Sequence, residues 1–370
     1  TVTTPFDPVV RDGRIYGRGT SDDKGPAVAA LYAMRAVKEL SVPVTKGCRL
    51  ILGSDEESGM SDVKHYYSVE KEAPMTFSPD SSFPVTNVEK GHFRMKLSAS
   101  FDKEEAEAAL IELSSGDTIN IVPGRGYAIV RGLDDDLIRE YAEKVEKETG
   151  VSFTVSGTTE GLRIDAEGQS AHAAHPDDGK NAALALLHLI NLLPLSDCRQ
   201  TRLLKSLEEL FPYGDNRGRA LGIAVDDELS GPTTVSGDIL RADAASISLE
   251  VDSRTAVAAD EDNTEKPARK RVAEAGFELD CAMRPPHVVD GDSDFVKTLL
   301  RCYEDVTGLK GHLDSMGGGT YVHDLKNGVA FGAVAEGTDT NMHGADEFMS
   351  IKELKDAAVI FALAISELCR

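Results

Sequence analysis

Residues 13–37 read GRIYGRGTSDDKGPAVAALYAMRAV, and this stretch decides the class of fold. A glycine-rich turn leads into Asp22-Asp23, and Pro26 follows where a helix can begin, because the first helical position tolerates the missing N–H of proline. Apolar residues then recur at helical spacing, at Val28, Leu31, Met34 and Val37. The stretch therefore predicts a turn that carries carboxylates into a helix, as in α/β folds.

The α/β pattern continues on the C-terminal side of this helix and returns near the end of the chain. Residues 48–53 (CRLILG) predict a short apolar strand, residues 54–59 (SDEESG) a polar turn, and Ser61 the cap of a helix through Tyr67. After Pro285-Pro286, we expect a helix over 295–306 and a buried strand over 328–334 (GVAFGAV). Residues 350–353 (SIKE) form a capping box that opens a last helix, which we expect to end near Leu368.

The middle of the chain mixes strands and helices differently. Residues 93–100 alternate apolar and polar, as a half-buried strand does. We expect helices over 137–148 and 180–193, a strand over 162–166, and two strands around a turn over 234–250. This mixture is typical of an α+β domain. We therefore predict one α/β domain, formed by residues 1–88 and 286–370, interrupted by an inserted domain at 89–285, which is an ordinary domain size.

Composition excludes several classes of partner. The formal net charge is -23, which would repel a phosphate backbone and an anionic membrane surface. The longest apolar stretch, 182–195, is too short to span a bilayer. The five cysteines are scattered and odd in number, which favours a reducing, cytoplasmic compartment. No signal peptide is visible at Thr1, and the missing initiating Met indicates that the chain begins inside a longer gene product.

Four short clusters place carboxylates or a histidine in loops that follow strands or precede helices. They are Asp22-Asp23, Glu56-Glu57, Asp80 and His343. Taken singly, each has a plain structural interpretation, such as helix capping, a solvated pair or a turn. Together they form the ligand set of divalent metals such as zinc or manganese. An adjacent Glu-Glu pair suits a hydrolase, because one carboxylate can bind a metal while its neighbour takes a proton from water.

The chain resembles a known family at these positions. The strings GRGTSDDKGP, GSDEESG, FSPDSSFPV, AHAAHP and MHGADE look like those of the co-catalytic metallopeptidases, which include aminoacylases, carnosinases, desuccinylases and PepV-type bacterial dipeptidases. FSPDSSFPV followed by EKG, and the long insertion, resemble the PepV-type branch. The resemblance implies a zinc-exopeptidase-like catalytic domain with a mixed sheet flanked by helices, and a ferredoxin-like inserted lid. It also implies two divalent metal ions, zinc or manganese.

The resemblance assigns roles to the acidic clusters. Asp22 would bridge the two metals, and an unusual, cis-type peptide bond would join it to Asp23. Glu56 would be the general base. Glu57 and His343 would complete one metal site with Asp22, and Asp80 would serve the other metal.

The resemblance also assigns residues that contact the substrate. His172 would polarise the scissile carbonyl, and Asn120 and Arg254 would hold the substrate. Gly318, Gly319 and Thr320, in the run that begins at Gly317, would receive its carboxylate. Each of these residues has a structural alternative. His172 could cap the helix near Lys180, and His175 competes with it for the functional role. Asn120 could be a turn residue, Arg254 could form a surface ion pair, and the glycines could simply be flexible.

One family motif is absent. The family has a His-x-Asp motif upstream of the segment with which this chain begins, and its His is a ligand of the metal at Asp80. We expect truncation, or cleavage into a separate fragment, and natural loss with inactivity is the alternative. The resemblance implies hydrolysis of dipeptides by a monomer, with a homodimer as the alternative. The rival functions are deacylation of N-acyl amino acids and, for an incomplete fragment, binding of amino acids or peptides alone.

Overall fold

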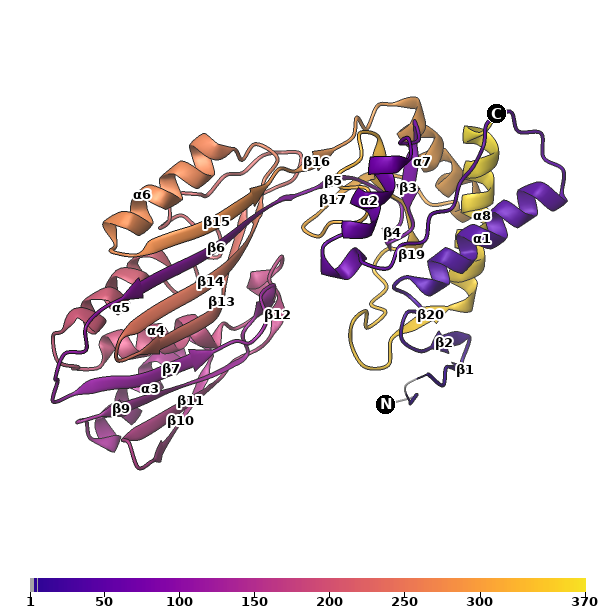
Figure 1. Ribbon diagram of the computed structural model, residues 1–370. Helices are drawn as coiled ribbons and strands as arrows, with labels where there is room; N and C mark the ends of the chain where they lie inside the picture. Colours follow the sequence, from indigo (N-terminus) through magenta and orange to yellow (C-terminus); the bar gives the residue numbers. More distant parts are fainter. Residues whose placement is uncertain (1–2, 5) are drawn as a thin grey trace. The chain divides into compact units, whose positions relative to one another are not determined.

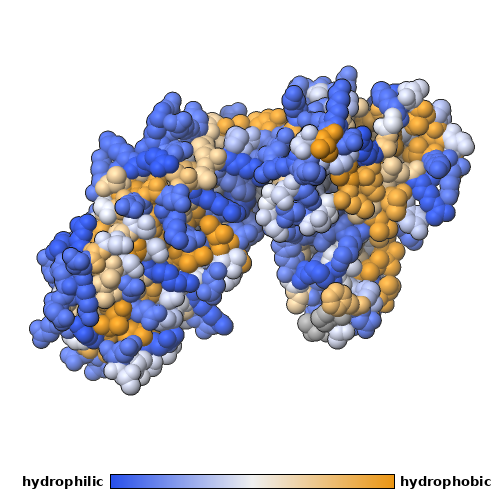
Figure 2. All heavy atoms as spheres, in the orientation of Figure 1, coloured by the Kyte–Doolittle hydropathy of each residue, from blue (hydrophilic) through white to orange (hydrophobic). Residues whose placement is uncertain are grey.

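The computed structural model describes residues 3–4 and 6–370. The chain forms two compact units (Figure 1). Unit 1 combines Thr1–Glu89 with His287–Arg370, and unit 2 is Lys90–Pro286. Hydrophilic side chains cover much of the visible face of both units (Figure 2), in keeping with the strong negative charge. None of the helices in the described part of the chain is long and apolar enough to cross a membrane.

Unit 1 is built on a mixed five-stranded sheet. Its strands are β3 (Thr76–Ser78), β5 (Val85–Glu89), β16 (His287–Val288), β17 (Leu313–Met316) and β18 (Gly328–Ala330). Strand β5 is central, because it pairs parallel with β17 and antiparallel with β16 and β18. Smaller sheets join β1 (Val9–Arg11), β2 (Arg14–Tyr16) and β20 (Phe348–Ser350), and also β4 (Ser81–Ser82) and β19 (Ala333–Val334). The helices are α1 (Lys24–Glu39), α2 (Ser61–Val69), α7 (Asp294–Thr307) and α8 (Ile351–Leu368).

The predicted helices of unit 1 form, although not every side chain lies where the pattern places it. Helix α1 is confirmed, but the apolar spacing does not mark its core-facing side, because Val28 is 48% exposed and Leu31 is 53% exposed. The buried side of α1 carries Ala29, Ala33 and Val37 instead. Helix α1 packs against α8, and both contribute to one hydrophobic core.

The Ser350 side chain accepts a hydrogen bond from the Glu353 backbone N–H at the start of α8, which confirms the predicted cap. The reciprocal half of the capping box does not form, because Oε1 of Glu353 accepts from the Thr338 hydroxyl and Oε2 has no partner in the part of the chain that the structure describes.

Three further local predictions in unit 1 are wrong. Residues 48–53 form no strand, because their backbone joins no ladder among the described residues, and Leu52 is 70% exposed. Ser61 is not the cap of α2: it is the first helical residue, and its N–H and hydroxyl donate to Asp55 instead. Residues 328–334 form two short strands rather than one, because Gly332 interrupts them at a φ of 75°, a conformation that glycine adopts readily.

Unit 2 is an eight-stranded antiparallel sheet in the order β10-β11-β9-β7-β13-β14-β6-β15. The strands are β6 (Gly91–Ser100), β7 (Ala109–Ser115), β9 (Arg125–Arg131), β10 (Ser152–Gly157), β11 (Leu162–Glu167), β13 (Thr234–Asp243), β14 (Ser246–Thr255) and β15 (Glu278–Arg284). The helices α3 (Asp135–Thr149), α4 (Ala182–Leu192), α5 (Arg199–Leu210) and α6 (Lys266–Glu274) pack on it. A separate short pair joins β8 (Ile121–Val122) and β12 (Ala171–His172).

The sequence patterns of unit 2 match its structure. Along β6, Phe93, Met95 and Leu97 are buried while Arg94 and Lys96 are exposed, which confirms the predicted alternation. Helix α4 is apolar on most of its surface and lies in the main core of this unit, as its hydrophobicity predicts. His188 and Asn191 interrupt that surface and hydrogen-bond to Glu208. The predicted helix over 137–148 and the strand pair over 234–250 are confirmed as α3 and as β13 with β14.

Candidate active site

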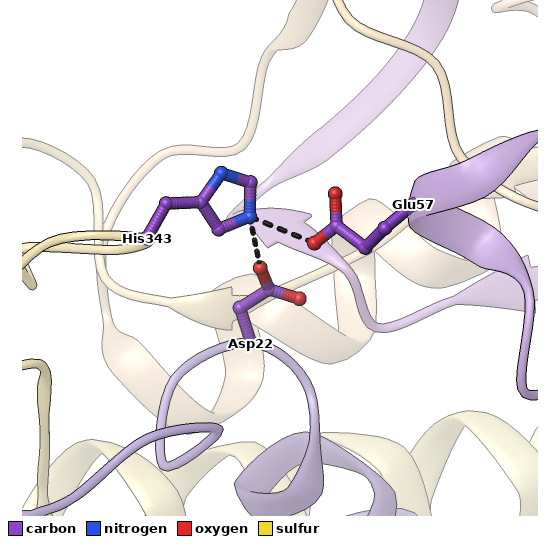
Figure 3. Close-up of side chains that lie close together, drawn as sticks. All are labelled: Asp22, Glu57 and His343. Atoms are coloured by element: carbon purple, nitrogen blue, oxygen red, sulfur yellow. Dashed lines mark hydrogen bonds and ion pairs between the residues drawn. The ribbon is translucent and has the colours of Figure 1, made fainter.

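Three residues from distant parts of unit 1 meet at one point (Figure 3). His343 Nε2 lies 2.6 Å from Asp22 Oδ2 and 2.7 Å from Glu57 Oε1. Asp22 belongs to the turn before α1, Glu57 to the 3-10 turn Glu56–Ser58, and His343 to the loop before β20. One nitrogen and two carboxylate oxygens that converge in this way make a donor set suited to a divalent metal.

A buried carboxylate shapes the turn that carries Asp22. Glu347, which is 2% exposed, accepts hydrogen bonds from the backbone N–H groups of Gly19, Ser21 and Asp22 at 3.0, 2.9 and 3.1 Å. Arg18 donates to the same carboxylate at 2.6 Å and also to the carbonyl of Gly344 at 2.8 Å. Glu347 therefore ties the Asp22 turn to the His343 loop.

Sequence reasoning assigned no role to Glu347, although it belongs to the quoted string MHGADE. Burial alone would raise the pKa of Glu347, but the three N–H groups and Arg18 outweigh it, so its pKa lies below the ordinary value. The ionised form is thus favoured where it organises the turn. The peptide bond between Asp22 and Asp23 is cis, as the resemblance implied.

A second carboxylate holds the turn that carries Glu57. Asp62, in α2, accepts from the backbone N–H groups of Ser54 and Asp55 at 2.6 and 3.0 Å. The hydroxyl of Tyr321 donates to the same Asp62 oxygen at 2.7 Å. These bonds fasten the Glu57 turn to α2 and to the segment after the Gly317–Gly319 run.

Further acidic groups crowd around this point. The pKa of Asp23 is raised to about 9 and that of Glu56 to about 8, in both cases first by burial and then by neighbouring carboxylates. Asp80 has its pKa raised to about 7 by burial and by Asp22, Glu57 and Glu89. Oδ1 of Asp23 is buried and has no hydrogen-bond partner. Repulsion of this kind is relieved by a bound cation, so these residues fit the metal that the donor set suggests.

His343 responds to the same charges in the opposite direction. Burial lowers its pKa, but the carboxylates of Glu57 and Asp22 outweigh burial, so the pKa of His343 is raised above the ordinary value. The two carboxylates thus favour the protonated form of the imidazole. A metal ion would take over that role and bind the neutral ring.

The glycine run of unit 1 ends in a buried anchor. The N–H of Thr320 lies 3.2 Å from both oxygens of Glu89, and its hydroxyl donates to Glu89 at 2.8 Å. His323 Nδ1 lies 2.8 Å from the same carboxylate. Both donors of Thr320 thus serve Glu89, while Gly318 and Gly319 are partly exposed beside it. Glu89 belongs to the quoted string EKG, but sequence reasoning assigned no role to it or to His323.

Unit 2 contains the other expected residues. Nδ1 of His172 accepts a hydrogen bond from the backbone N–H of Ala174 at 3.0 Å, which places the proton of the neutral ring on Nε2. The exposed His172 does not cap α4, because Asn181 does so, with its side chain accepting from the Leu184 N–H. Asn120 precedes β8 and has a φ of 75°.

Arg254 is not a surface ion pair. It is 4% exposed, and its Nε donates to Oδ1 of Asp252, itself fully buried, at 2.6 Å. Another nitrogen of its guanidinium lies 3.3 Å from His92 Nε2. The structure thus gathers Asp22, Glu57 and His343 by direct contact, brings Glu56 and Asp80 within their electrostatic reach, and places Asn120, His172 and Arg254 within unit 2.

The fold and this donor set are typical of metal-dependent hydrolases, and the comparisons with known proteins agree with this class. Residues 1–367 match the model of Peptidase family M20/M25/M40, and the chain belongs to this family. It is a metallopeptidase.

Two curated relatives illustrate the similarity. "Putative dipeptidase YtjP" of Bacillus subtilis is 35% identical over 371 residues, which span 99% of this chain and 79% of that protein. "Putative dipeptidase SH1171" of Staphylococcus haemolyticus is 31% identical over 374 residues, with the same coverage of 99% and 79%.

Solved structures share the fold at low sequence identity. The aminoacylhistidine dipeptidase of Vibrio alginolyticus gives a TM-score of 0.55 at 15% identity and covers 100% of this chain and 82% of its own. Human carnosine dipeptidase 1 gives 0.53 at 13% identity, covering 100% and 76%. These similarities confirm the mixed α/β fold that the sequence predicts.

Proposed function

We propose that this protein hydrolyses the peptide bond of dipeptides, using divalent metal ions held by the acidic cluster of unit 1. The observation that carries the proposal is the meeting of His343 Nε2 with one oxygen each of Asp22 and Glu57, at 2.6 and 2.7 Å. The dipeptidase names of the relatives at 35% and 31% identity support the substrate class.

The metal assignment follows the donors. Asp22, Glu57 and His343 hold one ion, and Asp22 and Asp80 contribute to a second. Zinc and manganese both suit this mixture of carboxylate and imidazole. When bound, such an ion acts as a Lewis acid and lowers the pKa of water.

Glu56 is the proposed proton carrier. It takes one proton from the attacking water, the water oxygen bonds to the carbonyl carbon, and the C–N bond breaks as Glu56 returns the proton to the leaving amine. The raised pKa of Glu56, about 8, results from burial and then from the charges of Asp80 and Glu57. A bound cation would lower this pKa towards neutral, where a carboxylate can both accept and donate the proton.

Unit 2 is the proposed lid. We assign to His172 the N–H that stabilises the oxyanion, because Nδ1 is already engaged by Ala174. Asn120 and Arg254 hold the substrate, and Gly318 and Gly319 receive its carboxylate, while Thr320 anchors that loop on Glu89.

Oligomeric state and location complete the proposal. The eight-stranded sheet within one chain supports a monomer, since the sheet needs no second copy. All five cysteines are unpaired, which supports the cytoplasm as the compartment.

The test is hydrolysis of a panel of unblocked dipeptides by this chain, with Mn²⁺ or Zn²⁺ added and a chelator as control. We expect turnover that the chelator abolishes, and a kcat/KM that falls when the substrate amine is acetylated. Preference for the acetylated substrates would instead establish a deacylase. Absence of turnover on both, by protein shown to bind the metal, would contradict the proposal.

A further inference from the structure

In unit 2, the buried carboxylate of Asp238 accepts a hydrogen bond from Asn120, the residue that precedes the β8–β12 strand pair. Asp238 is fully buried, and its Oδ2 accepts a hydrogen bond from the Asn120 backbone N–H at 2.8 Å. Oδ1 of Asp238 accepts from the hydroxyl of Ser236 at 2.5 Å. Both oxygens thus have a partner, and one of these partners is a backbone group 118 residues away in the sequence.

The hydrogen bond between Asp238 and Asn120 matters because Asn120 adopts an uncommon backbone conformation. Its φ of 75° lies in the left-handed region, which non-glycine residues adopt rarely and asparagine more readily than most. The N–H of Asn120 donates to the carboxylate of Asp238, and such a bond is charge-assisted, and stronger than a bond between neutral groups, when the carboxylate is ionised. Asp238 therefore opposes relaxation of Asn120 to an ordinary conformation.

The same hydrogen-bond chain continues to His172. The carbonyl of Asn120 accepts from the Ala173 N–H at 2.8 Å, directly after β12. Strands β8 and β12 then pair in the register Val122 with Ala171 and Ile121 with His172. A two-residue pair of this kind is weak by itself, so its position depends on its anchors.

The backbone of Asp238 is also held closely. A register shift interrupts β13 between Gly237 and Ile239, and the Asn181 side chain donates to the Gly237 carbonyl at 2.8 Å. A Cβ on Gly116 would lie 1.8 Å from the Asp238 carbonyl oxygen, so the loop that leads to Asn120 starts against the same residue. Asp238 thus contacts the loop 116–120 at both ends.

This anchor lies beside open space. A groove of about 500 Å³ is lined by Gly116, Thr118, Ile121 and Ser170, among others, and so borders the loop, strand β8 and the residue before β12. Without its anchor, the strand pair has room to shift on this side.

We propose that Asp238 is a positioning residue: it sets the backbone of Asn120 and, through the Asn120–Ala173 hydrogen bond and the β8–β12 pair, the position of His172. The inference rests on the proposed function where it concerns turnover, since it takes Asn120 and His172 as the residues that contact substrate. The positional relationship itself lies wholly within unit 2.

The test compares Asp238→Ala with Asp238→Asn, which keeps an oxygen that can accept the Asn120 N–H. Ser236→Ala is the matched control, because it removes the other partner of Asp238 and leaves the Asn120 bond in place. The first readout is amide hydrogen exchange of Asn120 and Ala173. We expect about tenfold faster exchange in Asp238→Ala, and exchange close to the unmodified protein in Asp238→Asn and Ser236→Ala.

The second readout is dipeptide turnover. Because small misplacements of catalytic groups are costly, we expect kcat/KM to fall about tenfold or more in Asp238→Ala, with Asp238→Asn restoring most of it and metal affinity unchanged. If Asp238→Ala does not fold, Asp238→Ser replaces it in both comparisons. The serine side chain keeps a hydroxyl beside Ser236 but is too short to accept the hydrogen bond from the Asn120 N–H.

The two hypotheses fail in different ways. Unchanged exchange of Asn120 and Ala173 in folded Asp238→Ala or Asp238→Ser overturns the positioning role, whatever the turnover. If the unmodified protein hydrolyses no dipeptide, the proposed function fails, and faster exchange confined to the variants that lose the Asn120 bond still supports the positioning role.

Discussion

His343 Nε2 lies 2.6 Å from Asp22 Oδ2, although 321 positions separate the two residues in the chain. The contact joins the loop before the last helix to the turn before the first one, and Glu57 meets it from a third segment. The candidate metal centre therefore depends on the folded form of unit 1, and metal binding should in turn stabilise that form.

Removal of the imidazole should weaken metal binding directly. We expect His343→Ala to lower the affinity for Mn²⁺ or Zn²⁺ about tenfold or more, as loss of a supporting residue alone can do. Titration calorimetry with the metal alone measures the change, and His312→Ala, at a partly exposed histidine of the same unit, is the control. Equal affinities of the two variants would exclude His343 as a ligand.

Substitutions of Glu56 and Glu57 should distinguish loss of the catalytic step from loss of metal binding. Because Glu56 is the proposed proton carrier and not a ligand, Glu56→Gln should lower kcat by about 10²–10⁴-fold and leave metal affinity nearly unchanged. Glu57→Gln should weaken metal binding, since Glu57 is one of the three proposed ligands and lies against His343. Activity measured at saturating metal distinguishes these effects. A fully active Glu56→Gln variant would contradict the assignment of Glu56 as the general base.

Glu347 should prove to be a positioning residue of the metal site. In Glu347→Ala the N–H groups of Gly19, Ser21 and Asp22 lose their acceptor. Unsatisfied buried donors cost about 1–3 kcal/mol each where water cannot replace the acceptor, so we expect a lower Tm and weaker metal binding.

Glu353→Ala is the matched control for Glu347. It removes a carboxylate from the first turn of α8, close in sequence but without these three contacts. If both variants bind metal equally well, Glu347 does not organise the Asp22 turn.

The stability of unit 2 should depend on the protonation of His188. Its Nδ1 lies 2.5 Å from Glu208 and its Nε2 lies 3.1 Å from Glu148. Burial lowers its pKa, but these two carboxylates outweigh burial, so the pKa of His188 in the folded protein is raised above 6.5. The protonated ring then contributes stability that is complete below the unfolded pKa and is lost as pH rises through the folded pKa.

The check is the free energy of unfolding at pH 6 and pH 8.5 for the unmodified protein and for His188→Gln. Because other groups also titrate in this range, the informative quantity is the difference between the two proteins at each pH. We expect the unmodified protein to have an advantage, below about 1 kcal/mol for partly exposed pairs, that shrinks at pH 8.5. His65→Gln, at an exposed position of α2, should show no such trend, and an advantage that grows with pH would refute the assignment.

Local sequence patterns determined most of the described helices, although not α5 and α6, together with four of the eight strands in the sheet of unit 2 and the identity of the acidic clusters. Helical spacing in α1, alternation in β6 and the Ser350 cap need only near neighbours along the chain to be interpreted, so they were predictable. Residues 48–53 show the limit: an apolar run becomes a strand only if another strand offers hydrogen bonds, and that depends on distant segments.

Only the tertiary structure decided which polar residues act together. Asp22, Glu57 and His343 were named from the sequence, but their contact arises because the turns that carry them are fastened by Glu347 and Asp62. Glu347 and Glu89 lie within the quoted strings MHGADE and EKG, and Asp238 lies in no such string, but no pattern assigned a role to any of them. Their roles come from burial and from backbone N–H groups far away in the sequence. A hydrogen bond across more than a hundred residues is a property of the folded chain, and no local pattern records it.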